Sequence, residues 1–140
     1  RFAIVGTGLR GRSILSELLA IDGVQIVAVA DIVPEKAARA VKMCTDAGRA
    51  EPAVYTNGPR DYERLVQRDD IDFVYTATPW EWHTPVMLAA MRAGKHGGTE
   101  CNTGITLQDL WSLVDESERS RRHCLQLENC NYGYNEMLVN

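Results

Sequence analysis

Three glycines near the N-terminus, Gly6, Gly8 and Gly11, have the G-x-G-x-x-G spacing of a loop that binds phosphate groups. The first glycine allows a sharp turn, the second lets a pyrophosphate approach the backbone, and the third lets a helix pack closely on the preceding strand. The start of that helix offers free N–H groups and the positive end of its dipole to the phosphates. We also expect Arg10 or Arg12 to contact an anion, the alternative being that both are solvated. Glycine triplets occur in ordinary loops too, so the surrounding sequence decides.

The residues around the glycine triplet favour dinucleotide binding. The β-rich run 2–5 precedes it, and a helical pattern of apolar residues follows it. A second apolar run, 25–30, ends at Asp31, about 20 residues after the last glycine, where a carboxylate can bind the ribose hydroxyls of NAD. We therefore predict a bound NAD. Asp31 has an alternative function as the cap of the turn or helix before Pro34.

Further polar and aromatic side chains follow other apolar runs. The segment 80–83, Trp-Glu-Trp-His, comes after the run 71–77, and Glu100 ends the run 95–100. In an open parallel sheet, ligands bind outside the carboxyl ends of the strands, so these side chains should lie beside the glycine loop. We expect the indoles and the imidazole of His83 to contact the ligand, with surface packing as the alternative. We expect Glu100 to contact the cofactor or the substrate, the alternative being a simple strand-end carboxylate.

Strand-like and helical segments alternate along the chain, which predicts an α/β fold. The expected architecture is a doubly wound parallel sheet of the Rossmann type, in the order 3-2-1-4-5-6 with helices on both faces. The expected strands are 2–5, 25–30, 53–56, 71–77, 95–100 and 123–127. The expected helices follow Gly11, run from 35 to about 47, begin near Asp61, begin at Thr84 or Pro85, follow Thr106, and begin near Glu136.

Two of these elements carry specific expectations. In the fifth strand, Gly97 and Gly98 supply no side chains to pack and should weaken it. In the helix after Thr106, Asp109 is placed for a capping box. The expected buried stripe of this helix consists of Leu107, Leu110, Trp111 and Val114.

Composition limits the classes of function. The chain has 140 residues, enough for one domain with a core, and a net charge of −4 that gives no support for nucleic-acid binding. No apolar stretch is long enough to span a bilayer, and no signal peptide is visible. The four cysteines have no C-x-x-C spacing and no paired histidines, so we expect free thiols and no metal site.

Several motifs of the sequence resemble those of a known protein family. The motifs GTGLRGR, TPWEWH, AGKH…TE and HCLQLEN, together with the strand that ends at Asp31, resemble the Gfo/Idh/MocA-type sugar oxidoreductases. Within them, the chain is most similar to the NAD-dependent α-N-acetylgalactosaminidase branch of the glycoside hydrolases. The resemblance covers almost the whole chain, and the PWEWH and HC-x-x-LEN segments are its more specific parts.

The resemblance implies a two-domain enzyme. Residues 1–130 would form its NAD-binding Rossmann domain, and residues 131–140 would begin a truncated second domain that binds the sugar and supplies most proton-transfer groups. A homo-oligomer would form through that second domain, and the protein would be of a bacterial, soluble type, cytoplasmic or exported folded to the periplasm. The resemblance places the following residues at the cofactor: Gly6, Gly8, Leu9, Arg10, Gly11, Asp31, Trp80, Glu81, Trp82, His83, Glu100, Cys101 and Asn129.

The implied reaction is hydrolysis of an α-N-acetylgalactosaminide through transient oxidation of the sugar C3 hydroxyl, elimination, and re-reduction. Ordinary members of the superfamily carry Glu-Lys-Pro after the fifth strand, whereas this chain has Glu100-Cys101-Asn102. Cys101 cannot replace an ammonium group, which argues against a plain dehydrogenase; the glycosidase branch also lacks the lysine, although it usually has an apolar residue and a proline there. An NAD(H)-dependent sugar dehydrogenase and a non-catalytic NAD-binding sugar sensor are the alternatives.

Overall fold

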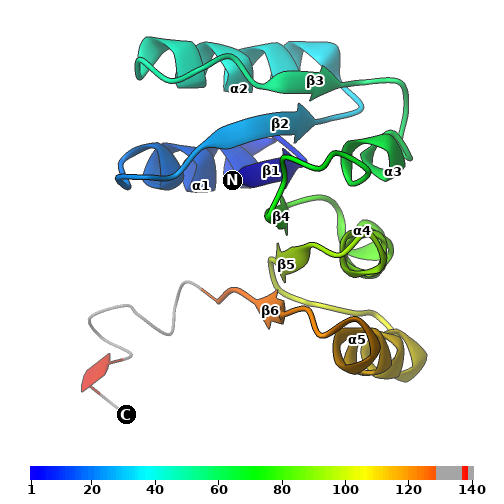
Figure 1. Ribbon diagram of the computed structural model, residues 1–140. Helices are drawn as coiled ribbons and strands as arrows, with labels where there is room; N and C mark the ends of the chain where they lie inside the picture. The colour runs from blue at the N-terminus through cyan, green and yellow to red at the C-terminus, as the bar shows by residue number, and fades with distance from the viewer. Residues whose placement is uncertain (129–136, 139–140) are drawn as a thin grey trace.

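The computed structural model describes residues 1–128 and 137–138. It contains six parallel strands in a single sheet, in the order β3-β2-β1-β4-β5-β6, which confirms the predicted α/β fold (Figure 1). The strands are β1 (Phe2–Val5), β2 (Ile26–Ala30), β3 (Ala53–Tyr55), β4 (Phe73–Thr76), β5 (His96–Thr99) and β6 (Cys124–Gln126). The helices are α1 (Leu9–Leu19), α2 (Pro34–Asp46), α3 (Tyr62–Leu65), α4 (Trp80–Arg92) and α5 (Leu107–Ser120).

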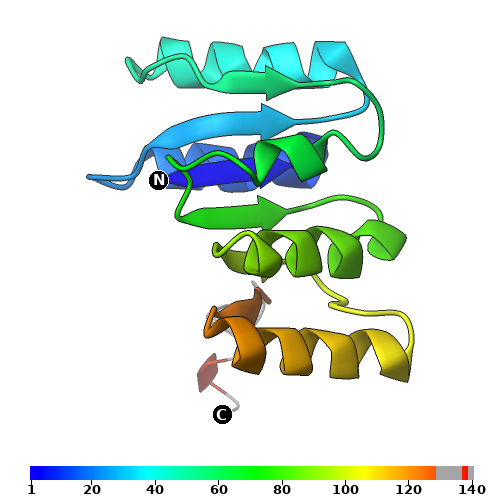
Figure 2. The same cartoon turned by 45° about the vertical axis from the view of Figure 1, so that its right-hand side comes forward.

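The helices cover both faces of the sheet. Helices α1 and α2 lie on one face, and α3, α4 and α5 lie on the other, as the two views in Figures 1 and 2 show. Each face has its own apolar core: Ile4 and Val29 pack with Leu15 of α1, whereas Ala3 and Val74 pack with Val86 of α4. Strand β1 alternates between the two cores because successive side chains of a strand point to opposite faces.

Strand β5 forms despite its glycines, because neighbouring side chains occupy the space that its own would fill. A Cβ on Gly97 would lie 2.7 Å from Sδ of Met87, and a Cβ on Gly98 would lie 2.8 Å from Cζ of Phe73 and 3.0 Å from Cδ1 of Leu127. Strand β5 pairs with both β4 and β6 along its length. The glycines therefore permit close packing across this strand, where we expected them only to weaken it.

Helix α4 begins earlier than we expected. The segment 80–83 was predicted to be a loop with the helix starting at Thr84 or Pro85, but the helix begins at Trp80, with Pro79 at its N-cap. Pro85 lies in the second turn, where it removes one backbone donor. The packing of Val86 and Ala90 into the core and the burial of His83 accompany this longer helix.

The start of α5 is as predicted, but its buried face is not. Thr106 accepts a hydrogen bond from the backbone of Asp109 at 3.1 Å, and the Asp109 carboxylate accepts one from the backbone of Thr106 at 2.8 Å. The predicted apolar stripe is exposed: Leu107, Leu110, Trp111 and Val114 are 70%, 44%, 57% and 47% accessible.

A different side of α5 faces α4. Leu113 packs with Met87 and Met91, and the buried carboxylate of Glu116 accepts hydrogen bonds from Arg92 of α4 and from Arg119. The apolar periodicity alone did not reveal this ion pair, which lies on the face of α5 that packs against α4. The prediction was therefore wrong because Leu113 and Glu116, which lie outside the predicted stripe, make the contact with α4.

Two histidines stack at the amino edge of the sheet. The ring centroids of His96 and His123 are 4.9 Å apart, and the backbone N–H of His123 donates to Nδ1 of His96 at 3.0 Å. Burial lowers the pKa of His96 below its usual value near 6.5, and the charges of His123 and Arg122 add to this effect.

We expect this pair to make stability depend on pH. The unfolded chain binds a proton at His96 near its usual pKa of about 6.5, whereas the folded chain binds it only at lower pH. The stabilisation is therefore complete above about pH 6.5 and is lost as the pH falls through the folded pKa. His96→Asn keeps an acceptor but does not titrate, so between about pH 7 and pH 5 its thermal unfolding midpoint should fall less than that of the wild type. Equal losses in the two proteins would contradict this assignment.

Within residues 1–128 and 137–138, no helix has the length and apolar character needed to cross a membrane. The same residues contain no cluster of three or more side chains that could hold a metal ion. Cys44, Cys101 and Cys124 are free thiols, as predicted, and Cys130 lies outside the described residues.

Candidate functional site

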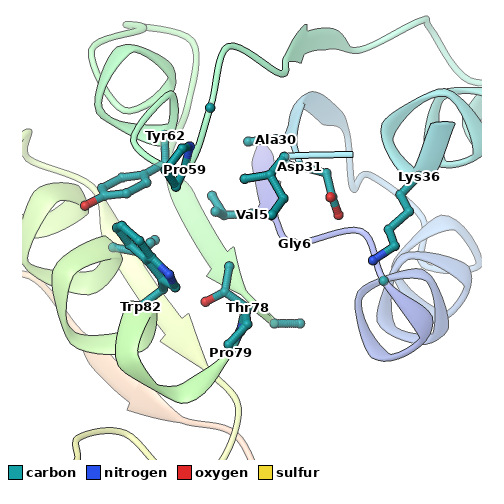
Figure 3. A pocket seen from close by; sticks show the side chains of 15 residues that line it. Val5, Gly6, Ala30, Asp31, Lys36, Pro59, Tyr62, Thr78, Pro79 and Trp82 are labelled. Carbon is teal, nitrogen blue, oxygen red and sulfur yellow. The ribbon is translucent and has the colours of Figure 1, made fainter. Parts of the chain in front are cut away.

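A pocket of about 190 Å³ opens at the carboxyl edge of the sheet, between the ends of β1, β2 and β4. Figure 3 shows Gly6 and Val5 at its base, Asp31 and Lys36 on one side, and Tyr62 and Trp82 on the other. The crevice lies where the chain leaves β1 for one face of the sheet and β4 for the other. This is the position at which open α/β sheets bind their ligands.

Each glycine of the loop has a distinct environment. Gly6 has a φ of +85°, and a Cβ there would lie 2.8 Å from the carbonyl oxygen of Ala77. A Cβ on Gly11 would lie 1.9 Å from the carbonyl oxygen of Gly6, so only glycine lets α1 lie this close to the turn. Around Gly8, by contrast, no atom other than those of its own chain neighbours lies within 4 Å of the Cβ position. The backbone at Gly8 is therefore open to a pyrophosphate, and the loop fits a dinucleotide.

Asp31 holds the loop and also lines the pocket. Its Oδ2 accepts hydrogen bonds from the backbone N–H of Thr7 at 2.8 Å and from the Thr7 hydroxyl at 3.0 Å, and its Oδ1 accepts one from the backbone of Val33 at 2.9 Å. The bond to Val33 is the turn-capping function that the sequence left as an alternative. The two functions are compatible, because Oδ1 accepts only the bond from Val33 and has a lone pair left for a ribose hydroxyl.

The four residues of the segment 80–83 do not share one location. Trp82 lines the pocket beside Tyr62, with their ring centroids 6.1 Å apart in an edge-to-face arrangement. Trp80 is 62% exposed and, with Glu81, lines a separate cavity between α4 and the start of α5. Because the segment is the first turn of a helix, its side chains point in different directions, and only Trp82 points into the pocket.

His83 is buried instead of lining the pocket. It is 1% exposed; Nδ1 lies 2.7 Å from the carbonyl oxygen of Asn102, and Nε2 lies 2.8 Å from that of Thr78. The imidazole thus ties the loop after β4 to the loop after β5. Its effect on a ligand in the pocket would be indirect, through the position of these two loops.

Arg10 and Glu100 form an ion pair beside the glycine loop. Nε of Arg10 lies 3.0 Å from Oε1 of Glu100, and the hydroxyl of Tyr75 donates a hydrogen bond to the same oxygen. Tyr75 is buried in the core beneath α1. Leu9 is 85% exposed at the start of α1, so its side chain is free to contact a ligand.

Cys101 forms a short contact at the end of β5. Its thiol donates to Oε2 of Glu128 at 2.7 Å, and Nε2 of Gln126 lies 3.5 Å from the sulfur. The bond to Glu128, together with burial, raises the pKa of the Cys101 thiol. The thiol is therefore protonated at neutral pH and is a poor nucleophile. Asn129, the last residue predicted at the cofactor, lies outside the described residues.

The sequence reasoning missed several pocket residues. Lys36, Tyr62 and Pro59 line the pocket although no motif marked them. Lys36 lies in the first turn of α2, the helix that begins shortly after Asp31. The spacing of residues in a helix could therefore have predicted that its side chain points toward the pocket. Its ammonium group is a cation within the same pocket as the Asp31 carboxylate, as Figure 3 shows.

The arrangement combines a phosphate loop with an open glycine, a carboxylate placed for ribose hydroxyls, and an apolar and aromatic wall. These are the parts needed to hold an adenine dinucleotide.

Comparisons with known proteins agree with this geometry. The model of the Gfo/Idh/MocA oxidoreductase family, NAD-binding Rossmann fold, matches residues 1–125. A glycosyl hydrolase family 109 protein of Saccharopolyspora erythraea is 56% identical over 99% of this chain, which spans 30% of that relative. A protein of the same name from Solibacter usitatus is 44% identical over 99% of this chain and 32% of its own length.

The fold also matches a solved structure. A crystal structure of an NAD-binding protein from Listeria innocua has a TM-score of 0.81 and 25% identity, covering 99% of this chain and 38% of that protein. The chain thus spans about a third of the length of the proteins it matches. On the family match and the observed sheet order, the chain belongs to the Gfo/Idh/MocA oxidoreductase family and forms its NAD-binding Rossmann domain.

Proposed function

We propose that this chain is the cofactor domain of an NAD-dependent glycosidase that acts on α-N-acetylgalactosaminides. The observation that carries the proposal is the identity of 56% over almost the whole chain to a glycosyl hydrolase family 109 protein. The pocket supports this proposal, because it contains the glycine loop that can bind phosphates and the Asp31 carboxylate that can bind a ribose, as a nicotinamide cofactor requires.

The proposed reaction cleaves a glycosidic bond without the usual pair of carboxylates. The sugar C3 hydroxyl is oxidised to a ketone, which acidifies the proton on C2; loss of that proton expels the aglycone, water adds, and C3 is reduced again. NAD, when bound, supplies the acceptor and donor of the hydride. The net change is hydrolysis, with no net consumption of the cofactor.

Within this chain, the residues around the pocket bind and orient. The glycine loop would bind the pyrophosphate, and Asp31 would bind the adenosine ribose. Trp82 and Tyr62 would line the part of the pocket that holds the adenine. We propose that Glu100 and Cys101 lie near the nicotinamide ribose. The groups that move protons at the sugar would be supplied mostly by residues beyond Asn140.

The Cys101 contact supports a glycosidase over a dehydrogenase. Position 101 holds a cysteine and therefore has no ammonium group to assist proton transfer at a sugar hydroxyl, and its thiol is bonded to Glu128 and stays protonated, so it does not act as a base either. We therefore prefer the cycle in which the cofactor is regenerated. A sugar dehydrogenase of the same family is the second candidate, favoured by the general family match to oxidoreductases.

Hydrolysis in deuterated water tests the mechanism. We expect deuterium at C2 of the released sugar, because the C2 proton leaves and is replaced from solvent, whereas acid–base hydrolysis leaves that C–H bond intact. NADH should not accumulate during turnover. Complete hydrolysis without deuterium at C2 would falsify the proposed mechanism.

Other outcomes of the same assay separate the alternatives. Stoichiometric formation of NADH without bond cleavage would identify a dehydrogenase. A bound cofactor with no product from any glycoside or free sugar would instead support a non-catalytic sensor.

We further propose that NAD is preferred over NADP. The Asp31 carboxylate accepts hydrogen bonds from a free 2′-hydroxyl and repels a 2′-phosphate. The two residues after it, Ile32 and Val33, provide no arginine to offset that repulsion. Lys36 lies in the same pocket, so the preference depends on the carboxylate outweighing one ammonium group.

A further inference from the structure

The hydroxyl of Tyr75 has no role in the proposed chemistry, yet it links the core of the domain to the cofactor edge. Tyr75 lies on β4 and is 1% exposed, among Ile4, Leu15 and Val29 on the α1 face of the sheet. A phenylalanine would fill the same space without placing a polar atom in an apolar core. The hydroxyl must therefore be bonded, and its partner is the carboxylate of Glu100.

One oxygen of the Glu100 carboxylate has two partners, a hydrogen-bond donor and a cation. The Tyr75 hydroxyl and Nε of Arg10 both contact Oε1, and the side chain of Glu100 is only 16% exposed. Neither contact uses Oε2, which is left to accept hydrogen bonds from a ligand. Arg10 contacts Glu100 through Nε and also interacts with the Tyr75 hydroxyl, and its guanidinium, with five N–H groups, can still donate to a phosphate.

We propose that Tyr75 is a positioning residue for cofactor binding, which fixes the carboxylate of Glu100 and, through it, the guanidinium of Arg10. The inference rests on the proposed function only in taking the ligand to be NAD. A buried residue that does not contact the ligand would thus set the geometry of two charged groups beside the glycine loop.

The electrostatics of the cluster support this role. Burial and the adjacent Glu100 carboxylate strongly raise the pKa of Tyr75, so its hydroxyl is a permanent donor at any physiological pH. The neutral Tyr75 hydroxyl and the Arg10 cation both contact the Glu100 carboxylate, so its orientation is fixed before a ligand binds. Preorganisation of this kind raises affinity because fewer side chains must be ordered on binding.

The test is a double-mutant cycle read by NAD affinity. Tyr75→Phe removes the donor and keeps the shape, and we expect the dissociation constant for NAD to rise about tenfold. Glu100→Ala removes the acceptor and should weaken binding at least as much. In the Glu100→Ala background, Tyr75→Phe should change the affinity by less than about twofold, because the side chain through which Tyr75 acts is gone.

Tyr55→Phe is the matched control. Its hydroxyl also interacts with a charged side chain, but that partner is Arg68, and Tyr55 lies on β3, whereas Tyr75 on β4 bonds Glu100. We expect its NAD affinity to equal that of the wild type. Thermal unfolding of each variant reports any loss of stability separately from affinity.

The possible results decide between three explanations. A lower unfolding midpoint of Tyr75→Phe with unchanged NAD affinity would overturn the proposal and leave Tyr75 a structural residue. Equal effects of Tyr75→Phe in both backgrounds would show that it does not act through Glu100. Because the readout is binding, a protein that passes this test but releases no sugar would contradict only the glycosidase proposal.

Discussion

Gly11→Ala should abolish NAD binding and destabilise the domain by about 3 kcal/mol or more. The new Cβ would lie 1.9 Å from the carbonyl oxygen of Gly6 and 3.0 Å from its carbonyl carbon. Both atoms belong to the backbone, so no side-chain rotation relieves the clash. The start of α1 must move away from the turn, and the N–H groups that would face the pyrophosphate move with it. Chemical denaturation measures the stability, and calorimetric titration measures the affinity for NAD.

Gly8→Ala is the control that separates folding from binding. Gly8 has a φ of −63°, which any residue can adopt, and no atom other than those of its own chain neighbours lies within 4 Å of its Cβ position. Its stability should therefore stay within about 0.5 kcal/mol of the wild type, while the methyl group blocks the pyrophosphate and lowers NAD affinity by about 100-fold. A stable Gly11→Ala protein that binds NAD normally would show that α1 can relax without consequence, against the geometry described.

Asp31→Ala should lower NAD affinity by about two orders of magnitude and, at the same time, raise the affinity for NADP. The ribose loses a charge-assisted hydrogen bond, and the 2′-phosphate no longer meets a carboxylate. Lys36, which lines the same pocket, then becomes an unopposed cation for that phosphate. Titration of both dinucleotides into the wild type and the variant measures the change in preference.

The effect of Asp31→Ala on binding must be separated from its effect on stability and on net charge. Asp31→Ala also leaves the backbone N–H groups of Thr7 and Val33 without their acceptor, which should cost about 1–3 kcal/mol of stability, so both titrations belong well below the unfolding temperature. Asp22→Ala removes an equal charge from an exposed turn between α1 and β2 and should leave both affinities unchanged. Parallel losses for NAD and NADP in Asp31→Ala would mean that the carboxylate only shapes the loop.

The parts of the site that the sequence predicted are those encoded by neighbouring residues. The G-x-G-x-x-G motif spans only six residues, so the sequence alone predicted the loop, and its spacing to Asp31 predicted the carboxylate. The alternation of strands and helices leaves few possible strand orders, so the order 3-2-1-4-5-6 could also be predicted. The prediction for α4 failed because Pro85 usually begins a helix, whereas here the core contacts of α4 extend the helix by five residues before it.

The parts that the sequence did not predict depend on residues that are distant in the chain. His83 was expected at the ligand, but its two ring nitrogens face carbonyl oxygens at positions 78 and 102, and a single sequence contains no sign of the second. The bond between Tyr75 and Glu100 likewise joins the interior of one strand to the end of the next. Such contacts depend on the register between β4 and β5, which only the folded structure provides.

The glycines of β5 have an evolutionary consequence. The volume that side chains at 97 and 98 would usually fill is occupied by Met87 from α4, by Phe73 from β4 and by Leu127, which follows β6. Because the interior is close-packed, the summed volume of neighbouring side chains can change little when residues are substituted. A larger side chain at 97 is therefore tolerated only with a smaller one at 87, and a larger one at 98 only with a smaller one at 73. Position 87 should therefore covary with 97, and position 73 with 98, among descendants of this protein, although neither pair touches the cofactor pocket.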